Sequence, residues 1–159
     1  MIKVDRSSGQ VVWRLGPEGD FTLEGAQGQD AMWFYNQHRP IWEGNGTLTL
    51  FDNGNERPGV SAPWTRIVTY ELDEEAMTAT QVWSYEVPYF YGFLGGVERT
   101  ASGTWLVAAG GNRDPDVPAY IIEVDPASGA PVWSLRAPES VIYRAGQVDS
   151  LYPDTVDSR

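Results

Sequence analysis

The sequence predicts an all-β fold that forms part of a β-propeller. Seventeen glycines and eleven prolines are spread through the 159 residues, which suits many short strands joined by turns. Two kinds of strand-turn-strand unit alternate along the chain. Four short strands therefore recur at a period of roughly fifty residues, which is the sequence signature of a propeller blade.

The first kind of unit is a short strand, an Asp, a turn, and a strand that carries a Trp. Asp can hydrogen-bond the backbone of its own turn, and Trp can pack between neighbouring sheets. We expect these two roles in all three copies: 2–15 with Asp5 and Trp13, 67–86 with Asp73 and Trp83, and 120–136 with Asp125 and Trp133.

The second kind of unit is EGNGTLTLFDNGN at 43–55 and TASGTWLVAAGGN at 100–112. In the first copy Asn45-Gly46 precedes an alternating apolar and polar stretch. Because Asn-Gly readily adopts two successive positive φ angles, this dipeptide predicts a tight two-residue hairpin.

Combining the units gives two full four-stranded blades plus flanking strands. One blade spans 36–86, with strands at 36–42, 47–52, 66–72 and 79–86. The other spans 94–136, with strands at 94–99, 104–109, 119–125 and 131–136. The third and fourth strands of a preceding blade fall within 1–15, an extra strand is expected at 140–151, and the partial propeller covers 1–152 with a tail at 153–159.

Composition excludes several classes of function. The net charge is −11 and no basic run exists, so we expect neither a nucleic acid nor an anionic membrane surface as partner. The chain has no cysteine, and we expect no metal site and no cofactor. No stretch is long and apolar enough for membrane insertion, and the N-terminal residues do not read as a signal peptide.

The loop lengths indicate where a functional site would lie. The connections 16–35, 53–65, 87–93 and 110–118 are long, and in a blade they all fall on one face. His38, the single histidine, begins the innermost strand of its blade at that face, and an imidazole can serve as nucleophile or proton carrier. Arg66, Tyr143 and Arg144 are expected at the same face as substrate-binding residues. The alternative is that His38 is an ordinary surface or core histidine.

A propeller needs at least four blades to close, and this chain holds fewer. Either the chain is the C-terminal part of a longer protein, or another copy completes the ring as a homo-oligomer. Unclosed sheets would otherwise leave unpaired edges, which natural proteins avoid.

The runs QHRPIWEGNGTLTLFDNGN, TRIVTYELDEEAMTATQVWSYE and IYRAG together resemble the bacterial arylsulfotransferases. These six-bladed enzymes move a sulfuryl group between phenols without a nucleotide sulfate donor. The resemblance runs from about Met1 to Tyr152 and covers the C-terminal half of that fold. It implies that His38 is the nucleophile that becomes transiently sulfated, that an aryl sulfate and a phenol are the substrates, and that the protein is periplasmic or secreted.

The resemblance also implies that the isolated chain is an inactive fragment. The family's other catalytic residues, two histidines and an arginine, belong to blades that precede this sequence. Only His38 is carried over from the family motif, whereas the anion-facing roles of Arg66 and Arg144 follow from their expected position.

A non-catalytic propeller scaffold or a quinoprotein-like binding module is the alternative. The pattern D-x-x-S-G-x-x-x-W, beginning at Asp5 and at Asp125, is similar to blades of quinone-cofactor dehydrogenases and of outer-membrane assembly scaffolds. Such repeats specify a fold rather than a reaction. The series QH, FDNG and TR favours the transferase, because the quinoprotein repeat does not require it.

Overall fold

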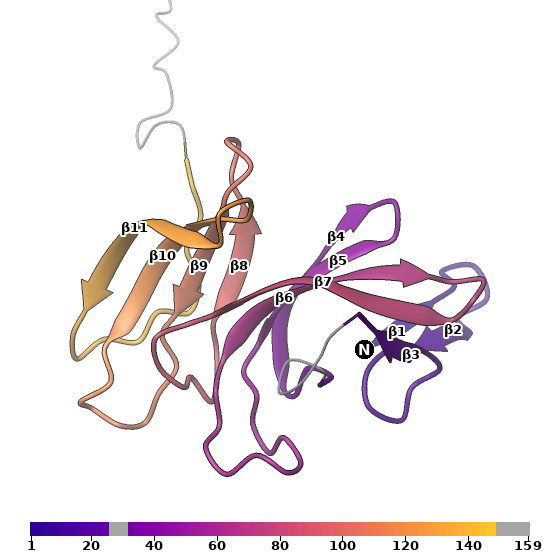
Figure 1. The fold of residues 1–159 in the computed structure, drawn as a ribbon, viewed down its shortest axis with the longest axis horizontal. Coiled ribbons are helices and arrows are strands. Elements are labelled where there is room, and N and C mark those ends of the chain that lie inside the picture. Colours follow the sequence, from indigo (N-terminus) through magenta and orange to yellow (C-terminus); the bar gives the residue numbers. More distant parts are fainter. Residues whose placement is uncertain (26–31, 149–159) are drawn as a thin grey trace, which may run out of the picture.

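The computed structural model describes residues 1–25 and 32–148, and this part of the chain is all-β with no helix (Figure 1). Its strands are β1 (Ile2–Val4), β2 (Val11–Arg14), β3 (Thr22–Glu24), β4 (Gln37–Gly44), β5 (Thr47–Asp52), β6 (Arg66–Asp73), β7 (Thr78–Glu86), β8 (Gly96–Arg99), β9 (Trp105–Ala109), β10 (Ala119–Asp125) and β11 (Ala130–Ala137).

The strands form three sheets, with the orders β1-β2, β3-β7-β6-β5-β4 and β11-β10-β9-β8. The eight strands expected for the two repeated units are present, and consecutive strands pair antiparallel within each unit. The expectation that 16–35 is only a connection was wrong. Thr22 to Glu24 pair in parallel with Thr78 to Thr80 of β7, so this short segment extends the sheet at its outer edge.

The predicted turns are confirmed. Asn45 and Gly46 have φ angles of 49° and 82°, and Gly44 pairs directly with Thr47 across the two-residue hairpin. Asp5 accepts hydrogen bonds from the backbone nitrogens of Ser7 and Ser8, at 2.9 and 2.7 Å. The Ser7 and Ser8 donors lower the pKa of Asp5 to about 2. Asp73 and Asp125 accept backbone hydrogen bonds in the same way within their own turns.

Two hydrophobic cores lie on opposite faces of the five-stranded sheet. Leu50, Val68 and Tyr70 contribute to the core shared with β2, which includes Trp13. Phe51 and residues of the four-stranded sheet contribute to the second core. The alternation of side chains along β5 explains this arrangement, since neighbouring residues point to opposite faces. Both faces of the central strands are therefore buried.

Trp133 departs from the expectation for the Trp-bearing strands. Trp13 is only 5% exposed and Trp83 packs against the second core, but Trp133 is 50% exposed. No further sheet of the described residues covers β11, and this explains the difference.

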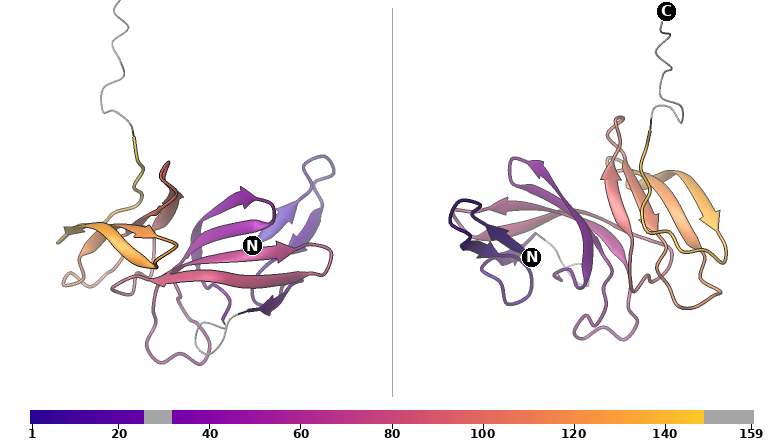
Figure 2. Two further views of the ribbon diagram at one scale, coloured as in Figure 1. Left: turned by 45° about the horizontal axis from the view of Figure 1, so that its top comes forward. Right: turned by 180° about the vertical axis from the view of Figure 1, so that it is seen from behind.

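The long connections 53–65, 87–95 and 110–118 lie toward one side of the two large sheets, at the bottom of Figure 1. After β11 the described chain continues to residue 148 beside the four-stranded sheet (Figure 2). The part of the expected strand 140–151 that is described, 140–148, has no strand pairing, and the remainder and the tail lie outside the described residues. Among the described residues no helix is long and apolar enough to cross a membrane.

Candidate functional site

His38 lies near the start of β4, the edge strand of the five-stranded sheet. The pairing of β4 with β5 shifts register after His38, and Arg39 has a positive φ of 47°. Such a bulge redirects the side chains next to it. The His38 ring is partly exposed, and its Nδ1 atom lies 2.6 Å from Oδ1 of Asn53.

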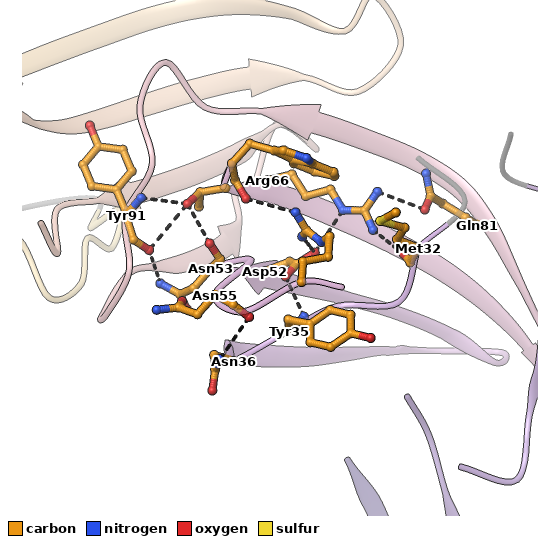
Figure 3. Close-up of polar contacts among 12 residues, drawn as sticks. Met32, Tyr35, Asn36, Asp52, Asn53, Asn55, Arg66, Gln81 and Tyr91 are labelled. Carbon is orange, nitrogen blue, oxygen red and sulfur yellow. Dashed lines mark hydrogen bonds and ion pairs between the residues drawn. The ribbon is translucent and has the colours of Figure 1, made fainter. Parts of the chain in front are cut away.

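Asn53 joins His38 to the loop that precedes β8. Its side-chain nitrogen donates hydrogen bonds to the carbonyl oxygens of Tyr91, at 2.6 Å, and Leu94, at 2.9 Å. Figure 3 shows the Asn53 amide turned toward Tyr91. Because Asn53 is fully buried, these contacts hold it rigidly. The imidazole is thus tied to a fixed support.

Asp52, the last residue of β5, contacts two buried arginines. Its Oδ2 atom lies 2.6 Å from Arg57 and 3.1 Å from Arg66, and all three side chains are at most 1% exposed. Its Oδ1 atom accepts a hydrogen bond from the backbone nitrogen of Tyr35. Asp52 and Arg66 also face each other in the β5–β6 register, so the ion pair joins the ends of neighbouring strands.

The two guanidinium groups have further partners. Arg66 donates hydrogen bonds to the carbonyl of Met32 and to Gln81 (Figure 3), and Arg57 donates to the carbonyl of Trp64. The Trp64 ring lies 3.7 Å from the Arg57 guanidinium carbon. Burial lowers the pKa of Arg57, and the Asp52 carboxylate opposes that shift. The charges are therefore held inside the protein rather than presented to solvent.

This polar cluster explains the FDNG motif. Phe51 enters a core, Asp52 binds the arginines, and Asn53 holds His38. Gly54 has a positive φ of 77°, and a Cβ there would collide with the Trp64 carbonyl. Its backbone nitrogen donates to the carbonyl of Tyr35, so the loop is also fixed to the segment that leads into β4. Every residue of the motif has a structural reason.

The expected site residues lie in three environments. His38 is partly exposed, Arg66 is buried against Asp52, and Tyr143 and Arg144 are exposed on the segment after β11. Arg144 lies 3.4 Å from the Tyr143 hydroxyl. Within the described residues, the side-chain hydrogen bond of His38 is made with Asn53 and not with any of the other three.

Arg144 and Arg39, the residue that follows His38, line the same pocket of about 250 Å³. Arg39 lies on its wall and makes a 3.3 Å ion pair with Glu98 of β8. Its lining consists of Arg39, Gly96, Val97, Glu98, Arg144, Ala145 and Gly146. Sequence reasoning missed Arg39 of this pocket and Arg57 of the Asp52 cluster as parts of the candidate site. The Q-H-R order was visible, but the bulge that places Arg39 was not.

The aromatic side chains of the long loops have several roles. Trp33 and Phe34 pack with Tyr70, and Tyr89 stacks on Tyr120. Phe90 instead lines a pocket of about 360 Å³, together with Asn55, Gly92, Phe93, Asn112 and Arg113. Several of these rings therefore serve packing, and Phe90 and Phe93 share a pocket that could hold an aromatic ligand.

No group of His, Cys, Asp and Glu side chains suited to a metal ion is found among the described residues. The chemistry available at the site comes from an imidazole, amides, guanidinium groups and carboxylates.

The sequence is similar to known proteins of one family. Residues 1–144 match the family model described as arylsulfotransferase (ASST). An arylsulfate sulfotransferase AssT of Escherichia coli O6:H1 (strain CFT073) is 39% identical over 64 residues, which cover 37% of this chain and 11% of that protein. The protein of the same name from Lelliottia amnigena is 38% identical over 64 residues, with the same coverage.

The matched stretch thus spans about a tenth of each of these relatives. The family match itself extends over most of the chain and includes β1 to β11 as well as Tyr143 and Arg144. The chain belongs to the arylsulfotransferase family.

Proposed function

We propose that this chain is the histidine-bearing part of an enzyme that transfers a sulfuryl group from an aryl sulfate to a phenol through a sulfated His38. The observation that carries the proposal is the 2.6 Å contact between His38 and buried Asn53, at the side of the sheets where the long loops gather. A partly exposed imidazole held by a rigid partner suits a nucleophile.

We also propose that the two large sheets are successive blades of a propeller. The β4 and β8 strands form the inner edges, and residues from both sheets share one core. Two such sheets and a flanking hairpin fall short of a closed ring, so further blades, from additional sequence or from another copy, would complete the site. We further propose a periplasmic or secreted location.

The proposed reaction has two displacements. In the first, the lone pair of His38 forms a bond to sulfur, and the bond between sulfur and the aryl oxygen breaks with its electrons leaving on the phenolate. In the second, the acceptor phenol gives its proton to the solvent as its oxygen forms the new bond to sulfur. The bond from sulfur to nitrogen then breaks and its electrons return to His38. This is covalent catalysis in which the leaving phenolate takes up a proton.

Cationic donors would stabilise the sulfuryl oxygens during both displacements. We assign this role to Arg144, with Tyr143 beside it, because both are exposed and Arg144 shares a pocket with Arg39. Arg66 is buried on Asp52, and we assign it a positioning role instead of the substrate contact expected from its place in the sequence. Guanidinium groups suit recognition of several oxygens at once.

The test is to incubate the complete propeller that includes this chain with p-nitrophenyl sulfate. We expect mass spectrometry to find a sulfuryl group on the peptide that contains His38, and His38→Ala to abolish release of the phenol. Trp42→Ala is the matched control, because Trp42 lies on the same strand near the hairpin and is 50% exposed. Continued turnover by His38→Ala would exclude the mechanism, and we expect the 159-residue chain alone to be inactive.

A scaffold without catalysis is the second candidate. It is favoured by the pairing of Arg39 with Glu98 and of Arg57 with Asp52, because each pair leaves less positive charge for a sulfate. Absence of both sulfated His38 and phenol release in the complete protein would support it.

A further inference from the structure

We infer that Asn53 is a positioning residue that holds neutral His38 with its proton on Nδ1, and so directs the Nε2 lone pair toward a ligand. The catalytic meaning of this inference rests on the proposed function. The tautomer itself depends only on the hydrogen bonds around Asn53.

Two hydrogen bonds determine the orientation of the Asn53 amide. Two backbone carbonyl oxygens, those of Tyr91 and Leu94, lie 2.6 and 2.9 Å from the Asn53 side-chain nitrogen. Carbonyl oxygens only accept hydrogen bonds, so the atom facing them must be the amide nitrogen. Exchanging the two ends of the amide would place Oδ1 against both carbonyls in a buried site. The Asn53 oxygen therefore faces His38.

The orientation of the Asn53 amide determines the tautomer of His38. The Asn53 Oδ1 atom can only accept, and it lies 2.6 Å from Nδ1 of the imidazole. Nδ1 must then carry a proton, and in the neutral ring Nε2 has the lone pair. Among the described residues Nε2 has no hydrogen-bond partner, so this lone pair remains available to a ligand.

The support of Asn53 is rigid. Thr65 is buried next to it, donates to the Asn53 carbonyl at 2.9 Å and accepts from the Tyr91 backbone nitrogen at 2.7 Å. Asp52, the preceding residue, is held by Arg57 and Arg66. Contacts on both sides of Asn53 thus fix the direction in which its oxygen points.

The neutral amide also suits an anionic substrate. A carboxylate at position 53 would accept the same hydrogen from His38, but it would add negative charge beside an approaching sulfate ester. The nearby carboxylate of Asp52 is instead neutralised by Arg57 and Arg66. Asn53 therefore orients the imidazole without repelling the substrate.

The test uses the fact that the 159-residue chain contains one histidine. Long-range proton-nitrogen NMR of the nitrogen-labelled chain, recorded above the pH at which the ring is protonated, reports which nitrogen carries the hydrogen. We expect a protonated Nδ1 and an unprotonated Nε2. A ring with its proton on Nε2, or one that averages between both forms, would overturn the inference, and this measurement needs no variant.

Asn53→Ala should return the ring to the averaged form seen for free imidazole. Asn55→Ala is the matched control, because Asn55 donates to the Gly92 carbonyl in the same loop but its loss removes no hydrogen bond of Asn53 or His38, and we expect it to keep the Nδ1 proton. If Asn53→Ala kept the Nδ1 proton, another group would be responsible and the inference would be wrong.

In the complete enzyme we expect Asn53→Ala to slow sulfation of His38 by about tenfold or more, since a wrong tautomer places the proton on the attacking nitrogen. The two proposals fail in different ways. An unsulfated His38 in the complete enzyme would remove the proposed function but leave the tautomer intact, whereas a proton on Nε2 would remove only the role of Asn53.

Discussion

Asp52 lies between two guanidinium groups that have almost no contact with solvent. Its carboxylate binds Arg57 and Arg66 and also the backbone nitrogen of Tyr35, next to the strand that carries His38. For Arg57, removal of this carboxylate would leave a buried charge without its ion-pair partner, which costs far more than the loss of an exposed pair. The cluster therefore connects the stability of the sheet to the position of the candidate nucleophile.

We expect Asp52→Asn to lower the free energy of unfolding by about 3–5 kcal/mol, because Arg57 would remain buried without its carboxylate partner. Urea unfolding of the 159-residue chain measures this. Glu74→Gln is the control, since Glu74 binds Lys3 at the surface and such pairs contribute about 1 kcal/mol or less. Similar losses in the two variants would contradict a special role for the buried cluster.

Sequence reasoning placed Asp52 and Asn53 at the end of one strand and Arg66 at the start of the next, and the register confirms that they are neighbours. It did not predict that Arg66 turns inward. The Arg66 guanidinium lies 4.9 Å from the Trp64 ring and shares Asp52 with Arg57, and both Trp64 and Arg57 lie in a long loop whose path leaves no periodic pattern in the sequence.

The strands themselves were largely predictable. Alternating apolar residues identify β5, and the Asn45-Gly46 dipeptide fixes its register with β4. The three residues of β3 were missed, because their strand character comes from pairing with β7 rather than from a local pattern. The reverse holds for 140–148, where a strand was expected as the start of a further blade but has no strand partner among the described residues.

The Asn45-Gly46 hairpin offers a test at the scale of one element. Gly46 has a φ of 82°, and an added Cβ would lie 2.7 Å from the carbonyl oxygen of Leu72. Gly9 has a similar φ of 72° but open space around it. We expect Gly9→Ala to cost about 1 kcal/mol of unfolding free energy from backbone strain alone. Gly46→Ala should cost more, because strain and collision combine.

Urea unfolding of both variants separates the two contributions. Equal losses would show that the Leu72 carbonyl moves aside, and the hairpin would then tolerate a side chain in its turn. Because β4 carries His38, a shift in this register would also move the imidazole relative to Asn53.

Across the whole molecule, sheets follow one another along the chain, with one core on each side of the five-stranded sheet. The outermost strands then have faces that nothing in the described residues covers. Ile2, Val4, Val11 and Val12 are exposed on the β1-β2 hairpin, and all but the last residue of β11 are exposed. These two surfaces are where additional blades of the proposed propeller would pack.

The surface of β11 leads to a prediction about the isolated chain. Val132, Trp133 and Leu135 are 62%, 50% and 47% exposed on a strand that, among the described strands, pairs only with β10. Exposed apolar edge strands associate with one another. We therefore expect the 159-residue chain to self-associate with increasing concentration in sedimentation velocity experiments. Added salt should strengthen the association, because it screens the repulsion between chains of net charge −11.

Val132→Lys places a charge on this edge and should shift the sedimentation profile toward the monomer. Val82→Lys is the matched control, because Val82 is 46% exposed on β7, away from β11. If both variants associate as the parent chain does, or if the parent stays monomeric at high salt, the β11 edge does not mediate association between chains. If Val132→Lys alone dissociates, the exposed edge of β11 is the surface through which the chains associate.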